Sequence, residues 1–291
     1  MVLKNMILDR FEVFYSINGG IEMSLMDKKK QMKKISVVIP TMNESKNIKE
    51  VFSNIPDFVD EIVVVDGNST DGTIEEIRKY RSDTKIIIEQ PSGKGAAMKT
   101  GFETATGDLI IMMDADGSHD PAEIPLLLDP ILDGFDVAKG SRLLPGGGSA
   151  DFTPFRRLGN KIFVSMVNTL YNTDYTDLCY GYRAFKKEAL DRIYCSSNGF
   201  EIETEQSILM KKAGLKIKEV PSFEAKRKNG DSNLNSIRDG FKILNVILKE
   251  YLKPSNKINK KDEHIISFTN KINSKAGRRI SRPDHYPLNL K

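Results

Sequence analysis

The sequence predicts an α/β fold in which a mostly parallel sheet is flanked by helices on both faces. First, short continuous apolar runs alternate with segments of helical period from residue 35 to residue 113. Strands of this kind are typical of parallel sheets whose two faces are both covered. Second, a polar cluster follows each apolar run, and α/β sheets bind ligands beyond the carboxyl ends of their strands.

The predicted elements follow one another in a regular order. Each strand is a short run rich in Val, Ile and Leu, and each helix has apolar residues spaced three or four apart. The predicted strands are residues 35–39, 61–65, 85–88 and 109–113, and the predicted helices are residues 45–54, 71–80 and 95–104. Beyond these, glycine-rich loops and two amphipathic stretches continue to about residue 253.

Each predicted strand delivers polar residues to the same edge of the sheet. The clusters are residues 40–44, 66–73, 90–95 and 114–119. Any one of them has the Gly, Asn, Asp and Ser content of an ordinary turn. Together they predict a ligand site at the carboxyl ends of the strands.

The most informative pair in these clusters is Asp114 and Asp116, which directly follows the fourth strand. Two carboxylates one residue apart at the end of a buried strand form a small hard-oxygen site that suits Mg²⁺ or Mn²⁺. A metal held there can bind a diphosphate, so the pair points to a nucleotide-linked donor.

The composition is that of a globular protein. Of 291 residues, 39% are hydrophobic and 29% are charged, enough for one large core or two small ones. The net charge of +4 does not indicate a nucleic-acid partner. Cys179 and Cys195 form no zinc or CxxC spacing, and so few cysteines favour a reducing cytosol.

No segment is expected to cross a membrane. No apolar run approaches the roughly 18–20 residues that a spanning helix needs, and the first residues lack the pattern of a signal peptide. We therefore expect a cytoplasmic protein that associates peripherally with the inner face of the membrane. Along the chain we expect a flexible extension over residues 1–32, a folded domain over residues 33–253 and a basic flexible tail over residues 254–291.

Other phosphate and metal motifs do not fit this chain. No G-x-G-x-x-G follows the first strand, and the G-K-G at residues 93–95 lacks the frame of a P-loop. Asp66 and Asp114 each begin something like an EF-hand loop, but the required Gly and the bidentate Glu are missing.

Four motifs, in order and at familiar spacings, resemble glycosyltransferase family 2, whose members have the GT-A fold. They are I-P-T-x-N-E at residues 39–44, V-D-G-N-S-T-D-G-T at 65–73, G-K-G at 93–95 and D-A-D at 114–116. G-S-R at 140–142 and R-x-x-G-x-S at 227–232 narrow the resemblance to the dolichol-phosphate and polyprenyl-phosphate sugar synthases. The resemblance covers about residues 33 to 252, so the catalytic domain of this family would occupy residues 33–253.

The resemblance implies a donor pocket. Pro40, Thr41 and Glu44 would line the nucleoside pocket, and Asp66 would read the base. Lys94 would lie near the base or the diphosphate. Donors of the GDP-mannose type and of the UDP-glucose type both fit this pattern.

The resemblance also implies residues that bind the metal and the phosphates. Asp114 and Asp116 would hold the donor diphosphate through Mg²⁺ or Mn²⁺. Arg142 and Arg227 would meet donor or acceptor phosphates, because a guanidinium fork matches phosphate oxygens. Ser232 belongs to the same motif as Arg227 and would contribute to substrate binding.

Three positions depart from the family pattern. Gly67 stands where many synthases carry a second Asp, so the resemblance does not indicate which nucleoside base is bound. Ser118 stands where the family often has Gln, and it is a poorer metal ligand. Asn233 replaces the usual Lys and removes one phosphate contact. Membrane-embedded members also continue into transmembrane helices that this chain lacks.

Two amphipathic stretches have two interpretations each. Residues 156–172 place apolar side chains on one helical face, with Arg156, Arg157 and Lys161 at its start. Such a helix either packs on the sheet or lies at a membrane interface, where its cations meet a lipid phosphate. Of these cations, we expect Arg157 to bind substrate. Residues 237–251 have the same ambiguity.

The predicted reaction is metal-dependent, inverting transfer from a nucleoside diphosphate sugar to a polyprenyl phosphate, or to another phosphate or hydroxyl acceptor. The expected catalytic residues are Asp116, Arg142 and Asp177. An anionic phosphate oxygen needs no general base, whereas a hydroxyl needs a carboxylate within hydrogen-bond reach. Asp177 is the first candidate for that base. Glu203 is the second; it alternates with Glu201 and Glu205, either along a strand or at the start of a helix.

Two alternatives belong to other classes. A nucleotidyltransferase uses a similar sheet, but its glycine- and arginine-rich loop after the first strand is absent here. A non-catalytic sugar-nucleotide-binding or membrane-surface protein of the same fold is left open by Ser118 and Asn233. The oligomeric state is also left open.

Overall fold

The computed structural model describes residues 33–230 and 234–253. The expected extension at residues 1–32, the expected tail at residues 254–291 and the predicted substrate-binding residue Ser232 lie outside the described residues. The strands are β1 (Ile35–Thr41), β2 (Glu61–Asp66), β3 (Lys85–Ile88), β4 (Leu109–Met112), β5 (Val137–Ser141), β6 (Gly148–Ser149), β7 (Arg183–Lys186), β8 (Ile217–Pro221) and β9 (Phe223–Glu224). The helices are α3 (Ser45–Asn54), α4 (Thr73–Tyr80), α5 (Lys94–Thr104), the 3₁₀ turn η1 (Pro121–Glu123), α6 (Ile124–Leu132), α7 (Pro154–Tyr171), α8 (Lys187–Leu190), α9 (Ile202–Lys212) and α10 (Ser236–Leu252).

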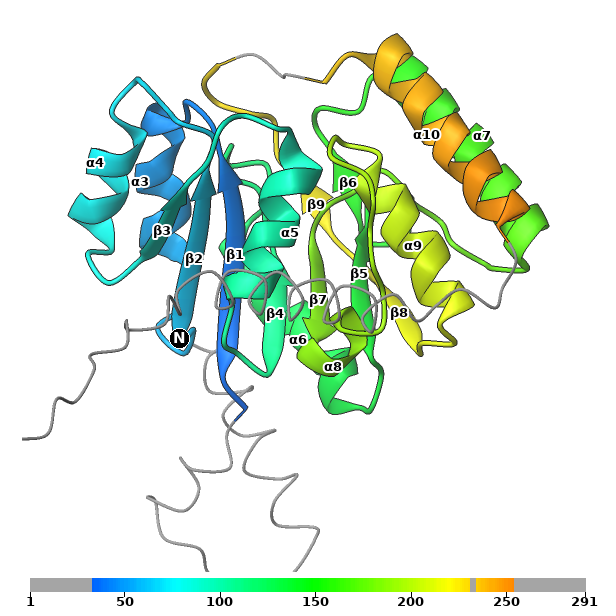
Figure 1. Ribbon diagram of the computed structural model, residues 1–291, viewed down its shortest axis with the longest axis horizontal. Coiled ribbons are helices and arrows are strands. Elements are labelled where there is room, and N and C mark those ends of the chain that lie inside the picture. Colours follow the sequence, from blue (N-terminus) through cyan, green and yellow to red (C-terminus); the bar gives the residue numbers. More distant parts are fainter. Residues whose placement is uncertain (1–32, 231–233, 254–291) are drawn as a thin grey trace, which may run out of the picture. The chain divides into compact units, whose positions relative to one another are not determined.

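Seven strands form one sheet in the order β3-β2-β1-β4-β7-β5-β8 (Figure 1). β1 is parallel to β2 and β4, β2 to β3, and β5 to β8. β7 runs antiparallel to both of its neighbours, β4 and β5. The prediction of a mostly parallel sheet is therefore confirmed, and every strand of this sheet except β7 brings its carboxyl end to the same edge.

Helices cover both faces of the sheet, as predicted. Along β1 the side chains alternate: Val37 belongs to a core cluster that includes residues of α3, α4 and α6, whereas Val38 belongs to a cluster that includes residues of α5, α8 and α9. A third cluster, which includes Val167, Ile208 and Ile247, joins α7, α9 and α10. In Figure 1, α7 and α10 lie side by side at one end of the sheet.

The first two strands run further than predicted, because Thr41 pairs with Asp66 in the β1–β2 ladder. The helix predicted from residue 71 begins instead at Thr73. The Asp71 carboxylate accepts hydrogen bonds from the Thr73 N–H at 3.1 Å and the Thr73 hydroxyl at 2.5 Å. Gly72 between them has a φ of 89°, in the left-handed region that glycine adopts without strain. A side-chain turn therefore replaces the first predicted helical residues.

The first amphipathic stretch forms α7. The Thr153 side chain caps the helix by accepting a hydrogen bond from the Arg156 N–H at 3.2 Å, and Pro154 occupies the first turn, where its missing N–H costs nothing. Asn172 ends the helix in the left-handed conformation. The second stretch forms α10. In the described ranges, no helix is both long enough and apolar enough to cross a bilayer.

The three alternating glutamates lie at the start of α9. The helical interpretation of this segment is confirmed, and the alternative of a strand is wrong.

Candidate active site

A cavity of about 910 Å³ opens at the edge of the sheet where the parallel strands end. Nine of the sequence-predicted residues line it: Pro40, Thr41, Glu44, Asp66, Lys94, Asp114, Asp116, Arg142 and Arg227. Segments from α5, α7, α9 and α10 complete its walls. The carboxyl ends of the strands therefore do meet at one site, as the clusters in the sequence predict.

The turn that carries Asp114 and Asp116 is held by its own residues. Ser118 donates to Asp116 Oδ1 from its backbone N–H at 2.9 Å and from its hydroxyl at 2.6 Å. The Asp114 N–H donates to Nδ1 of His119 at 3.0 Å, and the His119 ring stacks on Tyr182 with centroids 4.8 Å apart. Burial raises the pKa of Asp116, but the Ser118 hydrogen bonds together with His119 and Arg227 outweigh it, so that this pKa lies below its ordinary value.

The donor set fits a hard divalent cation. Asp114 and Asp116 both line the cavity and both keep part of their side-chain surface exposed. Carboxylate oxygens are the ligands that Mg²⁺ and Mn²⁺ prefer. Among the described residues, no group of three or more His, Cys, Asp or Glu is placed to hold a metal. A metal on this pair would therefore need further oxygen ligands from a diphosphate or from water.

Arg227 bridges two carboxylates of the cavity. Its Nη2 lies 2.8 Å from Asp116 Oδ2 and its Nη1 lies 3.0 Å from Glu44 Oε1. Burial raises the pKa of Glu44, and the bonds from Asn47 and Arg227 offset that rise only in part. The guanidinium of Arg227 thus joins the R-x-x-G-x-S motif to both the I-P-T-x-N-E motif and the D-A-D motif.

Lys94, the first residue of α5, bridges a second pair of carboxylates. Its Nζ lies 2.7 Å from Asp114 Oδ1 and 2.7 Å from Glu203 Oε1. Burial disfavours the ammonium, but the two carboxylates raise the pKa of Lys94 above its ordinary value. Glu203, which α9 supplies, is therefore committed to an ion pair, and this argues against its role as a general base.

Asp66 lines the cavity, but its carboxylate is already engaged by its own loop. It accepts from the Ser69 N–H and the Ser69 hydroxyl, both at 2.7 Å, and from the Thr41 hydroxyl at 3.0 Å. The side chain is fully buried. This shapes the loop after β2, and recognition of the base by Asp66 stays a prediction.

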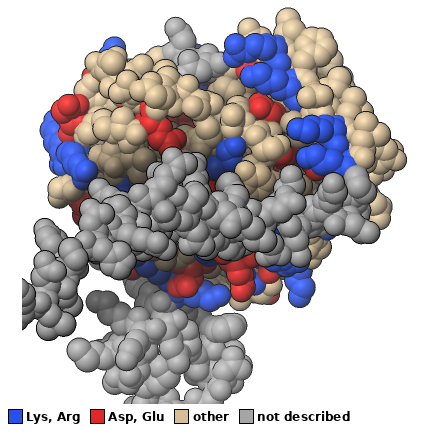
Figure 2. All heavy atoms as spheres, viewed as in Figure 1, with Lys and Arg blue, Asp and Glu red and all other residues tan. Residues whose placement is uncertain are grey.

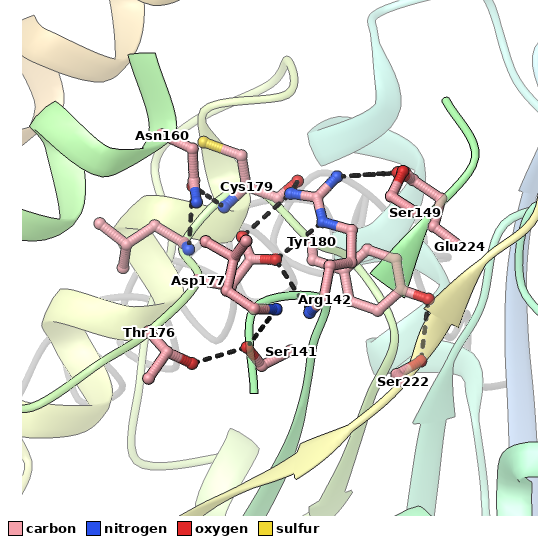
Figure 3. A network of polar contacts seen from close by, with 12 residues as sticks. Ser141, Arg142, Ser149, Asn160, Thr176, Asp177, Cys179, Tyr180, Ser222 and Glu224 are labelled. Carbon is pink, nitrogen blue, oxygen red and sulfur yellow. Dashed lines mark hydrogen bonds and ion pairs between the residues drawn. The ribbon is translucent and has the colours of Figure 1, made fainter. Parts of the chain in front are cut away.

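Arg142 and Asp177 form a buried ion pair (Figure 3). The Arg142 Nε donates to Asp177 Oδ2 at 2.7 Å and Nη2 donates to Oδ1 at 2.9 Å. Nη1 contacts both carboxylate oxygens of Glu224, at 3.2 and 3.1 Å, and Nη2 also donates to the Cys179 carbonyl. The five donors of this guanidinium thus all have acceptors, so contact with a phosphate requires Arg142 to release Glu224.

The expectation that Asp177 is a general base is corrected. Asp177 is fully buried, does not line the cavity, and has both oxygens bound to Arg142. Arg142 outweighs the effect of burial and holds the pKa of Asp177 below its ordinary value. Neither the position nor the basicity of this carboxylate suits it to accept a proton from a substrate.

Arg157 is a second correction. It lies on the exposed side of α7 and does not line the cavity, whereas its neighbour Arg156 does. The Arg156 Nη1 lies 3.0 Å from Asp151 Oδ2. One residue turns a helix by about 100°, so two adjacent arginines point in different directions.

Asn160, which we did not predict as a site residue, lies on α7 about one helical turn beyond Arg156. Figure 3 shows its side chain beside Cys179. Its Oδ1 accepts from the N–H groups of Leu178 and Cys179, both at 3.2 Å. It lines the cavity and is 2% exposed, and its Nδ2 has no hydrogen-bond partner in the described structure. The signal in the sequence is an amide among the mostly apolar residues of the inner face of α7.

An apolar surface lies on α7 and α10 beside the cavity. Of the thirteen large apolar side chains that are exposed in the described chain, three lie on α7 and five on α10, which makes eight on these two helices. They are Phe155, Leu158, Ile162, Ile237, Phe241, Leu248, Tyr251 and Leu252. Figure 2 shows Lys and Arg side chains gathered over the same part of this face, at the upper right.

Comparison with known sequences gives a family and two curated relatives. Residues 36–194 match the family described as glycosyl transferase family 2. The chain is 34% identical over 215 residues to glycosyltransferase AglJ of Haloferax volcanii, covering 71% of this chain and 68% of that relative. It is 37% identical over 210 residues to the dolichol-phosphate mannosyltransferase of Pyrococcus furiosus, covering 69% of this chain and 59% of that relative. The match thus leaves part of both relatives uncovered, and more than a third of the second.

A solved structure shares the fold. Glucosyl-3-phosphoglycerate synthase from Mycobacterium tuberculosis, in complex with Mn²⁺, uridine diphosphate and glucosyl-3-phosphoglycerate, superposes with a TM-score of 0.61 at 21% sequence identity. The alignment covers 81% of this chain and 86% of that one. The GT-A type of fold that the motifs imply is therefore confirmed.

Proposed function

This chain belongs to glycosyl transferase family 2 and is a glycosyltransferase, and we propose that it moves a sugar from a nucleoside diphosphate sugar to a polyprenyl phosphate with the help of Mg²⁺ or Mn²⁺. The non-catalytic alternative is set aside by this membership. The observation that carries the proposal is a single cavity that combines the Asp114–Asp116 pair with a separate set of cationic and amide donors.

The donor half of the cavity suits a diphosphate. Asp114 and Asp116 are the residues that would hold the divalent cation, and a cation bound there neutralises the charge that grows on a departing diphosphate. Lys94 and Arg227 lie against the same two carboxylates, within reach of the phosphate oxygens that such a cation would bind. The donor is of the GDP-mannose or UDP-glucose type.

The acceptor half suits a phosphate better than a hydroxyl. Arg142, Arg156 and Asn160 present guanidinium and amide groups to the cavity. The two carboxylates that were candidates for a general base are both committed, Asp177 to Arg142 and Glu203 to Lys94. A phosphate monoester is anionic near neutral pH, since its second pKa is about 6, and it can attack without losing a proton to the protein.

The proposed reaction is one displacement with inversion. A phosphate oxygen of the acceptor forms a bond to the anomeric carbon of the sugar while the bond from that carbon to the donor diphosphate breaks. Arg156 and the free Nδ2 of Asn160 bind the acceptor phosphate, and Arg142 joins them when it releases Glu224. Asp177 is a positioning residue in this scheme, because it holds the Arg142 guanidinium in place.

The apolar surface on α7 and α10 suits a polyprenyl acceptor. A polyprenyl chain stays in the lipid bilayer, so its phosphate reaches the protein at the membrane surface. A helix with exposed apolar residues and nearby cations binds such a surface by burying apolar area and by attraction to anionic lipids. We therefore place the protein peripherally at the inner face of the membrane, with Arg157 meeting lipid head groups.

The test is a transfer assay with a matched pair of acceptors. Labelled GDP-mannose and UDP-glucose are each offered with a polyprenyl phosphate or with the corresponding polyprenol, in Mn²⁺ or in EDTA. The proposal predicts a labelled lipid product from one donor, with the phosphate acceptor and with metal. Transfer to the polyprenol at an equal rate, or undiminished transfer in EDTA, would refute it.

A further inference from the structure

We infer that the carboxylate of Glu224 occupies the place of the acceptor phosphate on Arg142 in the free protein, and that Glu224 therefore sets how tightly an acceptor must bind. This role rests on the proposed function, which supplies a phosphate as the acceptor. Glu224 is then a specificity-determining residue, because every acceptor phosphate has to displace it.

Only one nitrogen of the Arg142 guanidinium is open to exchange. Asp177 takes Nε at 2.7 Å and one hydrogen of Nη2 at 2.9 Å, and the Cys179 carbonyl takes the other hydrogen of Nη2 at 3.0 Å. Nη1 contacts the two carboxylate oxygens of Glu224, at 3.2 and 3.1 Å. A phosphate that binds Arg142 without breaking its pair with Asp177 must therefore use Nη1, where Glu224 now lies (Figure 3).

Of the two carboxylates on Arg142, that of Glu224 is the more easily displaced. Asp177 is fully buried and does not line the cavity. Glu224 lines the cavity, its side chain is 17% exposed, and its contacts with Arg142 are the longer ones. Contact with water weakens an ion pair because water screens the two charges and solvates them when they separate. An incoming phosphate should therefore replace Glu224 and leave Asp177 in place.

Arg142 keeps its position when Glu224 leaves. Asp177 and the Cys179 carbonyl hold it from one side, and its Cζ atom also lies 4.1 Å from the ring centroid of Phe152 and 4.9 Å from that of Tyr180. The guanidinium therefore does not need Glu224 for its orientation. This distinguishes Glu224, a competitor of the phosphate, from Asp177, a positioning residue.

The strand that carries Glu224 has its own attachments. The Glu224 carbonyl accepts a hydrogen bond from the Ala150 N–H at 2.9 Å, and the Ser222 N–H donates to the Ser141 carbonyl at 3.1 Å. These bonds involve only the backbone. The carboxylate can therefore turn away from Arg142 while β9 stays where it is.

A competitor inside the site weakens all phosphate ligands alike. When the binding-competent form is only a fraction of the protein, the apparent affinity of each ligand falls by that fraction. A small free phosphate has only its polar contacts with which to displace Glu224. A prenyl phosphate also buries apolar surface, which adds affinity in proportion to the area buried. Glu224 thus reserves the site for phosphates that bring an apolar chain.

The experiment measures acceptor binding by calorimetry in the full chain, with Mg²⁺ and GDP or UDP present throughout. The probes are dimethylallyl phosphate and geranyl phosphate, which share a phosphate but differ in chain length, and the neutral alcohol geraniol. The variants are Glu224→Gln and Glu224→Ala. Glu188→Gln is the matched control, because Glu188 is an exposed residue of α8 outside the cavity, and the net charge changes equally.

Both Glu224 variants should bind the two prenyl phosphates roughly tenfold more tightly than wild type, and by the same factor for each chain length. Glu188→Gln should bind them as wild type does, and geraniol should bind equally to all four proteins. Asp177→Asn should change phosphate binding in the opposite direction, because it releases Arg142 itself. Glu224→Ala keeps the test valid should Glu224→Gln not fold.

Two outcomes separate the competitor role from the function on which it rests. If geranyl phosphate binds wild type and the Glu224 variants bind it equally or more weakly, Glu224 is not a competitor, and the proposed function stands. If geranyl phosphate binds neither wild type nor the Glu224 variants, although the nucleotide binds, the phosphate acceptor of the proposed function fails as well.

Discussion

The guanidinium of Arg142 holds the carboxylate of Asp177 through two hydrogen bonds, Nε to Oδ2 at 2.7 Å and Nη2 to Oδ1 at 2.9 Å. The Cζ atom of the same guanidinium lies 4.1 Å from the ring centroid of Phe152 and 4.9 Å from that of Tyr180. Removal of one partner from a buried ion pair leaves an uncompensated charge. The orientation of Arg142 at the cavity wall therefore depends on a residue that no substrate touches.

Replacing Asp177 with Asn should destabilise the protein by about 3 kcal/mol, because the Arg142 charge loses its main buried partner. The KM for the phosphate acceptor should rise more than kcat falls, since Arg142 is misplaced but the donor site is intact. Urea unfolding and acceptor titrations measure the two effects. Asp174→Asn, an exposed change three residues away, is the control. Near-wild-type stability and KM would contradict the positioning role.

The Asp177 contribution should also depend on pH. The ion pair lowers the folded-state pKa of Asp177, whereas the unfolded value is about 3.9. A carboxylate with a depressed pKa stabilises the fold above the unfolded pKa, and this stability is lost as the pH falls through the folded pKa. The difference in unfolding free energy between wild type and Asp177→Asn should therefore be constant above about pH 5 and shrink below pH 4. A difference that does not change with pH would refute this assignment.

Two glycines should respond to alanine in opposite directions. A Cβ on Gly101 of α5 would overlap Val38 Cγ1 on β1, so Gly101→Ala should cost roughly 1–3 kcal/mol by overpacking. A Cβ on Gly159 inside α7 meets nothing within 4 Å, so Gly159→Ala should add about 0.5–1 kcal/mol from helix propensity. Thermal or urea unfolding of the pair checks both signs. Equal effects would argue against the close contact of α5 with β1.

Membrane binding should depend on the exposed side of α7. Leu158 and Ile162 are one turn apart there, beside Arg157 and Lys161. The double change Leu158→Gln and Ile162→Gln should weaken binding to anionic vesicles by at least about tenfold, since each apolar side chain buried in lipid contributes roughly 1.5–3 kcal/mol.

The control for this experiment is Ile88→Gln on β3. Ile88 is 59% exposed, as fully as Leu158 and Ile162 of α7. It lies on β3, at the end of the sheet opposite to α7 and α10 (Figure 1). Vesicle flotation compares the variants. An equal loss of binding from the α7 and β3 changes, or no binding by wild type, would contradict the proposed membrane surface.

The donor half of the site could be predicted because it follows from strand order. Asp114, for example, lies at the end of a parallel strand, and the carboxyl ends of parallel strands meet at one edge. Local patterns set both the strands and the turns that follow them, as with Asp116 and Ser118. The cluster of these residues around one cavity then needs no information about distant pairing.

The acceptor half depends on pairings that no local pattern encodes. Arg142 and Asp177 are separated by 35 positions, and only the folded chain shows that they bind each other. The choice between Arg156 and Arg157 depends on helical phase, which the cap at Thr153 sets. Sequence reasoning placed both arginines on the right helix but selected the one that faces away from the cavity.

The most direct test of the account is thermal unfolding of wild type, Asp116→Asn and the exposed-loop control Asp133→Ala with GDP-mannose or UDP-glucose, in Mn²⁺ and in EDTA. One donor should stabilise wild type and the control only with Mn²⁺, by roughly 2.7 kcal/mol at a concentration one hundred times Kd, and Asp116→Asn should lose this stabilisation. Equal stabilisation of Asp116→Asn, or none of wild type by either donor, would contradict the metal-dependent donor site.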